Sequence, residues 1–179
     1  MRSRIERPIA LVGIMGAGKS TVGRLLALGL GVAFVDLDAA IEAVAGRSVA
    51  ELFAREGEPA FRRRESRALA AALGREASVV ACGGGVVLDP AHRRLLRERC
   101  HCVWLDVSAA VVWRRLAGEA SGRPLLAMED GERRLGELID ERSALYREVA
   151  ETRIATDGRT PEEVGRALLE ALAAAGPRA

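Results

Sequence analysis

Short apolar runs alternate along the chain with longer segments in which apolar residues recur at helical spacing. The short runs, which predict buried strands, lie at residues 9–12, 33–36, 78–82, 102–106 and 153–155. The predicted helices lie at residues 19–29, 39–45, 48–57, 59–73, 90–99, 108–116, 132–149 and from 160 to near the end. This alternation predicts an α/β fold, a three-layer α/β/α sandwich with a five-stranded parallel sheet. A length of 179 residues suits a single domain over residues 1–179.

The loop after the first predicted strand carries the strongest chemical signal. Residues 13–21 read Gly-Ile-Met-Gly-Ala-Gly-Lys-Ser-Thr between a strand and a helix, which is the context of a phosphate-binding P-loop. Glycines let successive backbone N–H groups face a phosphate, and the helix N-terminus adds its positive end. Lys19 can reach the β- and γ-phosphates, and the Ser20 hydroxyl can bind Mg²⁺. Lys19 is the only lysine in the chain, and a compact ammonium suits this loop better than a guanidinium.

Two aspartates follow the second predicted strand. The spacing of Asp36 and Asp38 should send both carboxylates toward the P-loop, because ligands gather at the carboxyl ends of parallel strands. One can hold Mg²⁺ through water, and the other can accept the proton of an attacking hydroxyl. For Asp38, an equally good use is as the N-cap of the helix from residue 39. Asp106 is a second metal candidate, although a cap or structural carboxylate is the favoured interpretation.

Glycine-rich segments after two later strands are further candidates for ligand binding. Three glycines at residues 83–85 suit close approach of backbone N–H groups to a ligand, or only a tight turn. Residues 118–131 lose helical spacing and are interrupted by glycine and proline. Arg123 in that segment can reach a phosphoryl group from a closing lid, or it lies on a plain surface loop.

Three consecutive arginines lie on the predicted helix 59–73. Arg62, Arg63 and Arg64 point about 100° apart, so one or two can enter a cleft while the rest face solvent. Phe61 should anchor this helix to the core, and Glu65 can orient Arg62 at i,i+3 spacing.

Composition narrows the partners and the compartment. Lys and Arg number 27 against 25 Asp and Glu, and aromatic residues make up 3% of the chain, so nucleic acid is not the expected partner. No apolar run approaches the ~20 residues of a membrane span, and the N-terminus lacks a signal-peptide core, so no membrane partner and a cytoplasmic location are expected.

The cysteines and histidines give no metal signal. Cys82, Cys100 and Cys102 read as free thiols, and a strand would place Cys100 and Cys102 on one face with His101 on the other. His92 is expected on the surface of an amphipathic helix.

With these segments placed, the chain resembles the shikimate kinases over almost its whole length. The resemblance rests on Gly-Ile-Met-Gly-Ala-Gly-Lys-Ser-Thr-Val-Gly-Arg at 13–24, Phe-Val-Asp-Leu-Asp at 34–38, Gly-Glu at 57–58 with Phe61, Arg62 and Glu65, the glycines at 83–85, Arg-Pro-Leu-Leu at 123–126, and Arg142 with Leu-Tyr at 145–146. The P-loop alone occurs in many kinases, whereas the order and spacing of the other motifs are more specific.

The resemblance implies a P-loop NTPase fold with substrate-binding helices at about 38–73 and a mobile lid at about 118–131. It implies Mg²⁺-dependent transfer of the ATP γ-phosphoryl to the 3-hydroxyl of shikimate, in chorismate and aromatic amino acid biosynthesis, by a monomer. Carried over by position, the ATP-binding residues are Gly16, Ala17, Gly18, Lys19, Ser20, Thr21, Arg123 and Arg159. The implied shikimate-binding residues are Asp38, Arg62, Gly84 and Arg142, the metal-binding residues Ser20 and Asp36, and the catalytic residues Lys19, Asp38 and Arg123. Arg115 lies where the family often has another arginine near the nucleotide.

Two alternatives stay open. A related kinase for gluconate or a nucleoside monophosphate would share the P-loop, although two arginines converging with Asp38 favour a small carboxylated polyol. A nucleotide-sensing module that has lost phosphoryl transfer is the other alternative, and the intact set of Lys19, Ser20, Asp36, Asp38 and Arg123 argues against it.

Overall fold

The computed structural model describes residues 7–74, 77–118 and 130–175 of the chain. Its elements are β1 (Ile9–Val12), α1 (Lys19–Leu30), β2 (Ala33–Asp36), α2 (Leu37–Ala45), α3 (Val49–Leu73), β3 (Ser78–Ala81), the short 3-10 helix η1 (Val86–Leu88), α4 (Pro90–Arg99), β4 (His101–Asp106), α5 (Ala109–Gly118), α6 (Gly131–Val149), β5 (Thr152–Ala155) and α7 (Pro161–Ala175). Every expected strand and helix is present, with small differences at the ends.

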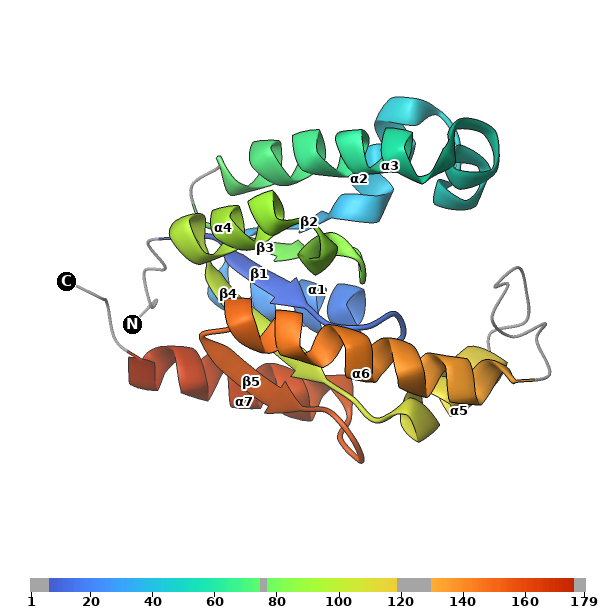
Figure 1. The fold of residues 1–179 in the computed structure, drawn as a ribbon. Coiled ribbons are helices and arrows are strands. Elements are labelled where there is room, and N and C mark those ends of the chain that lie inside the picture. Colours follow the sequence, from blue (N-terminus) through green and yellow to red (C-terminus); the bar gives the residue numbers. More distant parts are fainter. Residues whose placement is uncertain (1–6, 75–76, 119–129, 176–179) are drawn as a thin grey trace.

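The strands form one parallel sheet in the order β2-β3-β1-β4-β5. β1 lies at its centre, with β3 and β4 on either side. The carboxyl ends of the strands therefore share one edge, on the right in Figure 1, and the loops that follow them gather there. The expected α/β fold with a five-stranded parallel sheet is confirmed.

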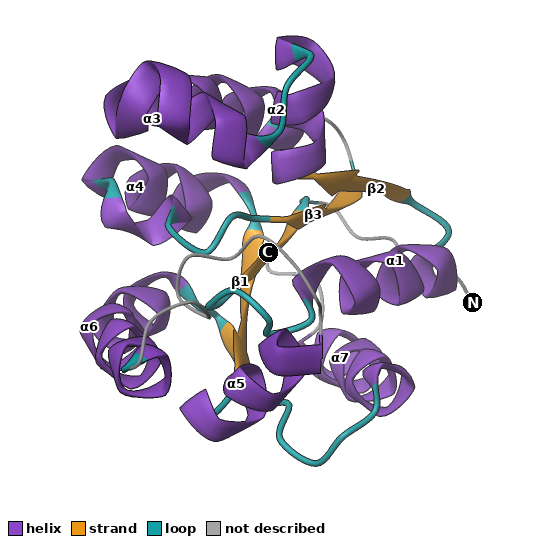
Figure 2. Ribbon diagram, turned by 90° about the vertical axis from the view of Figure 1, so that its right-hand side faces the viewer, coloured by secondary structure: helices purple, strands orange, loops and turns teal. Residues whose placement is uncertain are grey.

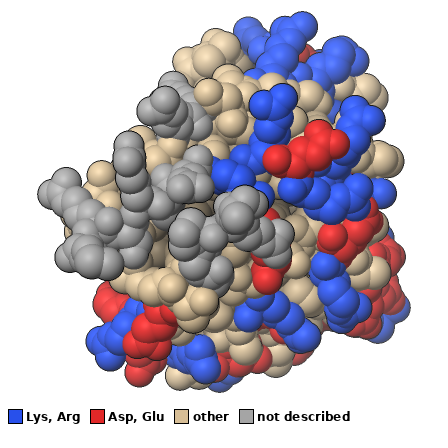
Figure 3. Space-filling model, turned by 90° about the vertical axis from the view of Figure 1, so that its left-hand side faces the viewer, with Lys and Arg blue, Asp and Glu red and all other residues tan. Residues whose placement is uncertain are grey.

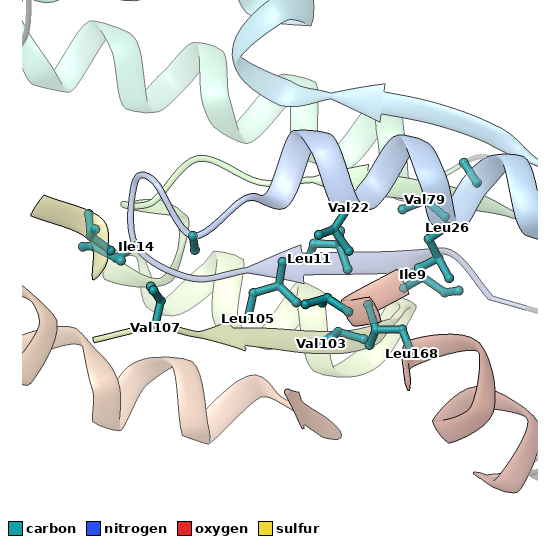
Figure 4. Packing of buried hydrophobic residues seen from close by; sticks show 14 of the residues in the cluster. Ile9, Leu11, Ile14, Val22, Leu26, Val79, Val103, Leu105, Val107 and Leu168 are labelled. Atoms are coloured by element: carbon teal, nitrogen blue, oxygen red, sulfur yellow. The ribbon is translucent and has the colours of Figure 1, made fainter. Parts of the chain in front are cut away.

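Alternate residues of the central strand face opposite sides of the sheet. Ile9 and Leu11 pack with α1 and α7, whereas Ala10 and Val12 pack with α3, α4 and α6. Figure 2 shows these two groups of helices on the two faces of the sheet. Figure 4 shows the buried side chains on the side of Ile9 and Leu11. Burial on both faces explains why the central strand is a continuous apolar run rather than an alternating one.

Helix α2 and the first part of α3 pack together around Ile41, Leu52 and Phe61. Ser48 and Glu51 form a capping box at the start of α3. Gly57 breaks the helical geometry inside α3, with φ 77° and ψ 169°, so α3 contains the two helices expected at 48–57 and 59–73. Phe61 is buried, as expected, and ties the second of them to α2.

The expectation for His92 is wrong, because its side chain is only 3% exposed. Its Nδ1 lies 3.1 Å from Val86 O and its Nε2 lies 2.6 Å from Ser66 Oγ. A carbonyl oxygen can only accept, so Nδ1 carries the proton that binds Val86. The second half of α3 packs against α4 and covers the face that carries His92. The apolar spacing of α4 alone does not reveal that neighbour.

All three cysteines are buried and free, as expected. Cys100 and Cys102 pack on the same side of the sheet, with α3, α4 and α6. Burial raises the pKa of the Cys82 thiol well above its usual value, so it stays neutral and unreactive. Among the described residues, no group of three or more His, Cys, Asp or Glu is arranged to hold a metal ion.

The face seen from the left of Figure 1 carries charges of both signs. Figure 3 shows acidic side chains beside arginines on it. No helix within the described ranges is both long and apolar enough to cross a membrane.

Candidate active site

The P-loop joins the carboxyl end of β1 to α1. Gly16 and Gly18 have φ of 75° and 91°, values that residues with a side chain rarely adopt, and Gly18 is the N-cap of α1. Lys19 opens the helix and is buried, with 9% exposed, and its Nζ donates to the carbonyls of Gly13 and Ile14, each at 2.8 Å. The ammonium is therefore held over the loop that precedes it.

Helix α5 also packs against the P-loop. Val112 and Leu116 lie in the same buried cluster as Ile14 and Ala17. Arg115 Nη1 donates to Gly16 O at 2.9 Å. Arg115, which the resemblance places near the nucleotide, thus contacts the P-loop directly.

A short hydrogen bond links the P-loop helix to the end of β2. Ser20 Oγ donates to Asp36 Oδ2 at 2.5 Å. Asp36 Oδ1 accepts from the backbone N–H of Asp38 at 3.1 Å and of Ala39 at 3.3 Å, so Asp36 is the N-cap of α2. The alternative that made Asp38 the cap is therefore wrong, because α2 begins at Leu37 and Asp38 lies in its first turn. The Asp38 carboxylate is free of the capping role.

The pKa of Asp38 is raised above its usual value. Burial is the largest cause, and the negative charges of Asp36 and Glu65 add to it, while the Lys19 ammonium opposes it. Burial and like charges both disfavour an ionised carboxylate. Asp38 therefore has more affinity for a proton than an exposed aspartate has.

The glycines at 83–85 bring these parts together, because each approaches a different neighbour. A Cβ on Gly83 would lie 3.0 Å from Glu65 Oε1 and 3.1 Å from Asp38 Oδ1. A Cβ on Gly84 would lie 3.2 Å from the backbone nitrogen of Met15, in the P-loop. The glycines therefore allow the backbone to lie close to Asp38, Glu65 and the P-loop, which a tight turn alone would not require.

Gly85 approaches the guanidinium of Arg62. A Cβ there would lie 2.5 Å from Nη2 and 2.8 Å from Nη1. Arg62 Nη1 donates to Glu65 Oε2 at 2.7 Å, and Nη2 donates to Glu58 at 2.9 Å. Burial lowers the pKa of Arg62, but the hydrogen bonds to Glu65 and Glu58 outweigh it and the net shift is upward. The expected i,i+3 pair with Glu65 is confirmed, and it fixes a permanent cation beside Gly85.

Only one of the three consecutive arginines faces this site. Arg64 turns back to pair with Glu56 at 2.9 Å, and Arg63 is exposed. The other Glu65 oxygen, Oε1, is buried and has no hydrogen-bond partner among the residues described. It lies beside Gly83, where an added Cβ would be 3.0 Å from it.

Helix α6 supplies a second arginine to these glycines, whereas Arg62 comes from α3. Arg142 Nη1 lies 3.4 Å from Gly84 O, a long hydrogen bond. Tyr146 OH donates to the same oxygen at 2.6 Å. Arg62 and Arg142 thus converge on neighbouring glycines. Sequence reasoning gave Tyr146 no role, although its position four residues after Arg142 on one helix face was a signal for it.

Three remaining candidates stand apart from this arrangement. Asp106 accepts from Arg153 Nε at 3.0 Å and Nη2 at 2.6 Å, which makes it a structural carboxylate, as expected. Arg159 is exposed in the loop before α7, and its side chain makes no hydrogen bond to another described residue. Arg123 and the lid at 118–131 fall almost wholly on residues 119–129, which lie outside the described part of the chain.

A parallel sheet with a P-loop at its central strand, an aspartate beside the loop and two arginines opposite defines a P-loop kinase for a small anionic acceptor. The family model "SKI: Shikimate kinase" matches residues 15–173. The chain is 44% identical to a shikimate kinase of Symbiobacterium thermophilum over 95% of this chain and 98% of that one. It is 48% identical to a shikimate kinase of Halorhodospira halophila over 94% and 95%. The chain belongs to the shikimate kinase family, and it is an ATP-dependent kinase with an alcohol acceptor.

Solved structures agree with this family. The shikimate kinase from Acinetobacter baumannii in complex with shikimate superposes with a TM-score of 0.91 at 36% identity, over 98% of this chain and 97% of that one. The shikimate kinase from Aquifex aeolicus gives 0.81 at 29% identity, over 94% and 97%. A gluconokinase from Sinorhizobium meliloti gives 0.63 at 21% identity, over 96% and 94%, which shows a shared fold alone.

Proposed function

We propose that the chain transfers the γ-phosphoryl group of ATP to the 3-hydroxyl of shikimate. The observation that carries the proposal is the convergence of Arg62 and Arg142 on Gly84 and Gly85, next to Asp38 and the P-loop. Two guanidinium groups suit the planar carboxylate of shikimate, because each can donate two parallel hydrogen bonds. A relative of known structure is described in complex with shikimate.

The nucleotide phosphates would lie on the P-loop. Backbone N–H groups of residues 16–21 and the N-terminus of α1 would bind the phosphates, with Ala17 and Thr21 among them. The Lys19 ammonium would leave the carbonyls of Gly13 and Ile14 for the β- and γ-phosphates. Arg115 would approach from α5, and Arg123 and Arg159 would complete the nucleotide site.

The acceptor would lie against Asp38 and the glycines. The bond that forms joins the 3-hydroxyl oxygen to the γ-phosphorus, and the bond that breaks joins that phosphorus to the β–γ bridging oxygen, which leaves with ADP. The proton of the hydroxyl passes to a carboxylate oxygen of Asp38, whose raised pKa suits this acceptance. Arg62, Arg142 and the backbone at Gly84 would hold the carboxylate end of the ring.

The residues at the start of α1 and the end of β2 fit Mg²⁺. The ion prefers oxygen ligands and keeps several waters, and a Ser20 hydroxyl with an Asp36 carboxylate offers this set beside the phosphates. Asp36 caps α2 with one oxygen and keeps the other toward Ser20, so it can hold the ion through water. When bound, Mg²⁺ neutralises charge on the phosphates.

A coupled ADP-release assay with shikimate, gluconate and AMP as acceptors tests the proposal. We expect turnover with shikimate and background rates with the other two. Turnover with gluconate or AMP in place of shikimate would reassign the acceptor. ATP binding without turnover on any of the three would favour the nucleotide-sensing alternative.

The wider proposals rest on the same family. We propose one kinase domain over residues 1–179, with acceptor-binding helices at about 38–73, acting as a cytoplasmic monomer. Size-exclusion chromatography with light scattering checks the last point, and a mass near twice 19.1 kDa would contradict it.

A further inference from the structure

Tyr146 is a buried tyrosine on the inner face of α6. Its side chain is 2% exposed and packs against Trp104, with ring centroids 5.9 Å apart. Its hydroxyl donates to Gly84 O at 2.6 Å. Burial raises the pKa of Tyr146 to about 12, although the Arg142 charge opposes this shift. The hydroxyl is therefore a neutral donor at any physiological pH.

The carbonyl that Tyr146 holds belongs to the same peptide unit as the N–H of Gly85. The described part of the chain contains no cis peptide bond, so this unit is planar and trans. In a trans peptide the C=O and the N–H point in opposite directions. A hydroxyl that draws the Gly84 carbonyl toward α6 therefore directs the Gly85 N–H away from α6.

The orientation of this peptide is not fixed by its own residues. Glycines have no Cβ, so the backbone at 83–85 has wide conformational freedom. Within the described ranges, neither the Gly84 N–H nor the Gly85 N–H donates a hydrogen bond. Arg142 reaches the Gly84 carbonyl only at 3.4 Å, so Tyr146 is its closer and stronger partner.

The direction given to the Gly85 N–H leads to the anionic end of the proposed acceptor site. Gly85 lies against Arg62, whose Nη2 would be 2.5 Å from a Cβ at that position. Arg142 comes from the α6 side of the same two glycines. A backbone N–H without a partner, beside two guanidinium groups, has the donor chemistry of a carboxylate site.

We propose that Tyr146 is a positioning residue for the acceptor, because its hydroxyl fixes the Gly84–Gly85 peptide with its N–H facing the carboxylate. Tyr146 does not touch the acceptor in this arrangement, and it acts only through the peptide. The inference rests on the proposed function, since it assumes that shikimate occupies this site.

Tyr146→Phe removes the hydroxyl and keeps the ring against Trp104. We expect the Kd and KM for shikimate to rise about five- to tenfold, the factor for one lost hydrogen bond, and to rise more than the values for ATP do. Ser143→Ala is the matched control, because Ser143 Oγ donates only to Ile139 O within α6, at 2.7 Å. It removes a hydroxyl from the same helix and should leave both affinities unchanged.

Calorimetric titrations of each variant with shikimate and with ATP separate the outcomes. An unchanged shikimate affinity in Tyr146→Phe, or an equal loss of both affinities, would overturn the positioning role. If the unsubstituted chain fails to bind shikimate at all, the proposed function has failed, and that result is visible before any variant is made.

A second measurement avoids any substitution that could unfold the chain. Tyr146 is the only tyrosine, so growth with 3-fluorotyrosine labels this position alone. We expect its ¹⁹F resonance to shift when shikimate is added, because the acceptor engages the peptide that the hydroxyl holds. A resonance that stays in place at saturating shikimate would overturn the proposal.

Discussion

Replacing Gly85 with alanine should weaken shikimate binding while leaving the fold intact. Gly85 has φ −95° and ψ 2°, outside the left-handed region, and alanine can adopt this backbone conformation. The new Cβ would lie 2.5 Å from Nη2 of Arg62 and 2.8 Å from Nη1. The contact is with the end of a flexible side chain, so the guanidinium moves and the backbone stays.

The size of the effect follows from the displacement. An ordinary contact begins at 3.4 Å, so Nη2 must move by about 0.9 Å, which is 3.4 minus 2.5. Such a shift removes about one charge-assisted hydrogen bond to a carboxylate, worth roughly 1.5–3 kcal/mol. The KM for shikimate should then rise about 10- to 150-fold. The free energy of unfolding should change by less than about 1 kcal/mol, because alanine also restrains the unfolded chain.

Steady-state kinetics with shikimate and with ATP, together with urea unfolding, measure both parts of this prediction. Gly136→Ala is the control, because its Cβ meets nothing closer than Ala109 Cβ at 4.0 Å and it lies inside α6. It should stabilise the chain by up to about 1 kcal/mol and leave both KM values unchanged. Equal KM values for shikimate in Gly85→Ala and the unsubstituted chain would refute the placement of Arg62.

Further predictions concern Asp38 and Arg115. Asp38→Asn should lower kcat about 10²- to 10⁴-fold and leave the ATP Kd unchanged in a titration, since the general base is lost; an equal loss of both would make Asp38 structural. The pKa of Asp38 is raised above the usual aspartate pKa, by burial first and then by Asp36 and Glu65. The carboxyl therefore becomes protonated at a higher pH than an exposed aspartate does, and kcat should fall as the pH is lowered into that range. Between the pKa of Asp38 in the unfolded chain and its higher pKa in the folded chain, the folded state binds more protons, so the free energy of unfolding falls as pH rises. Asp38→Asn removes the buried charge and should therefore melt at a higher temperature at pH 7, which calorimetry checks. Arg115→Ala should raise the KM for ATP several-fold but not that for shikimate, because Arg115 contacts Gly16.

Features set by neighbours in the sequence were predictable. The strands and helices follow from apolar spacing, and the P-loop follows from glycines between a strand and a helix. The pair of Arg62 with Glu65 follows from helical geometry, because residues three apart share one face. Each of these depends on a separation of a few residues along the chain.

Features set by contacts between distant segments were not predictable. The burial of His92 depends on α3 packing against α4, and the hydrogen bond from Tyr146 spans α6 and the glycine loop. The alternative that made Asp38 the cap of α2 is wrong for a different reason. Asp36 and Asp38 are both good caps, and the two-residue shift in the start of α2 decided between them.

The central claim is that Arg62 holds the carboxylate of the acceptor. A calorimetric titration with shikimate and with its methyl ester, on the unsubstituted chain and on Arg62→Ala, tests this claim directly. We predict that the ester binds the unsubstituted chain at least about tenfold more weakly than shikimate does, and that this difference becomes smaller in Arg62→Ala, where Arg142 is the remaining arginine at the carboxylate. An ester that binds the unsubstituted chain as tightly as shikimate does would contradict the account.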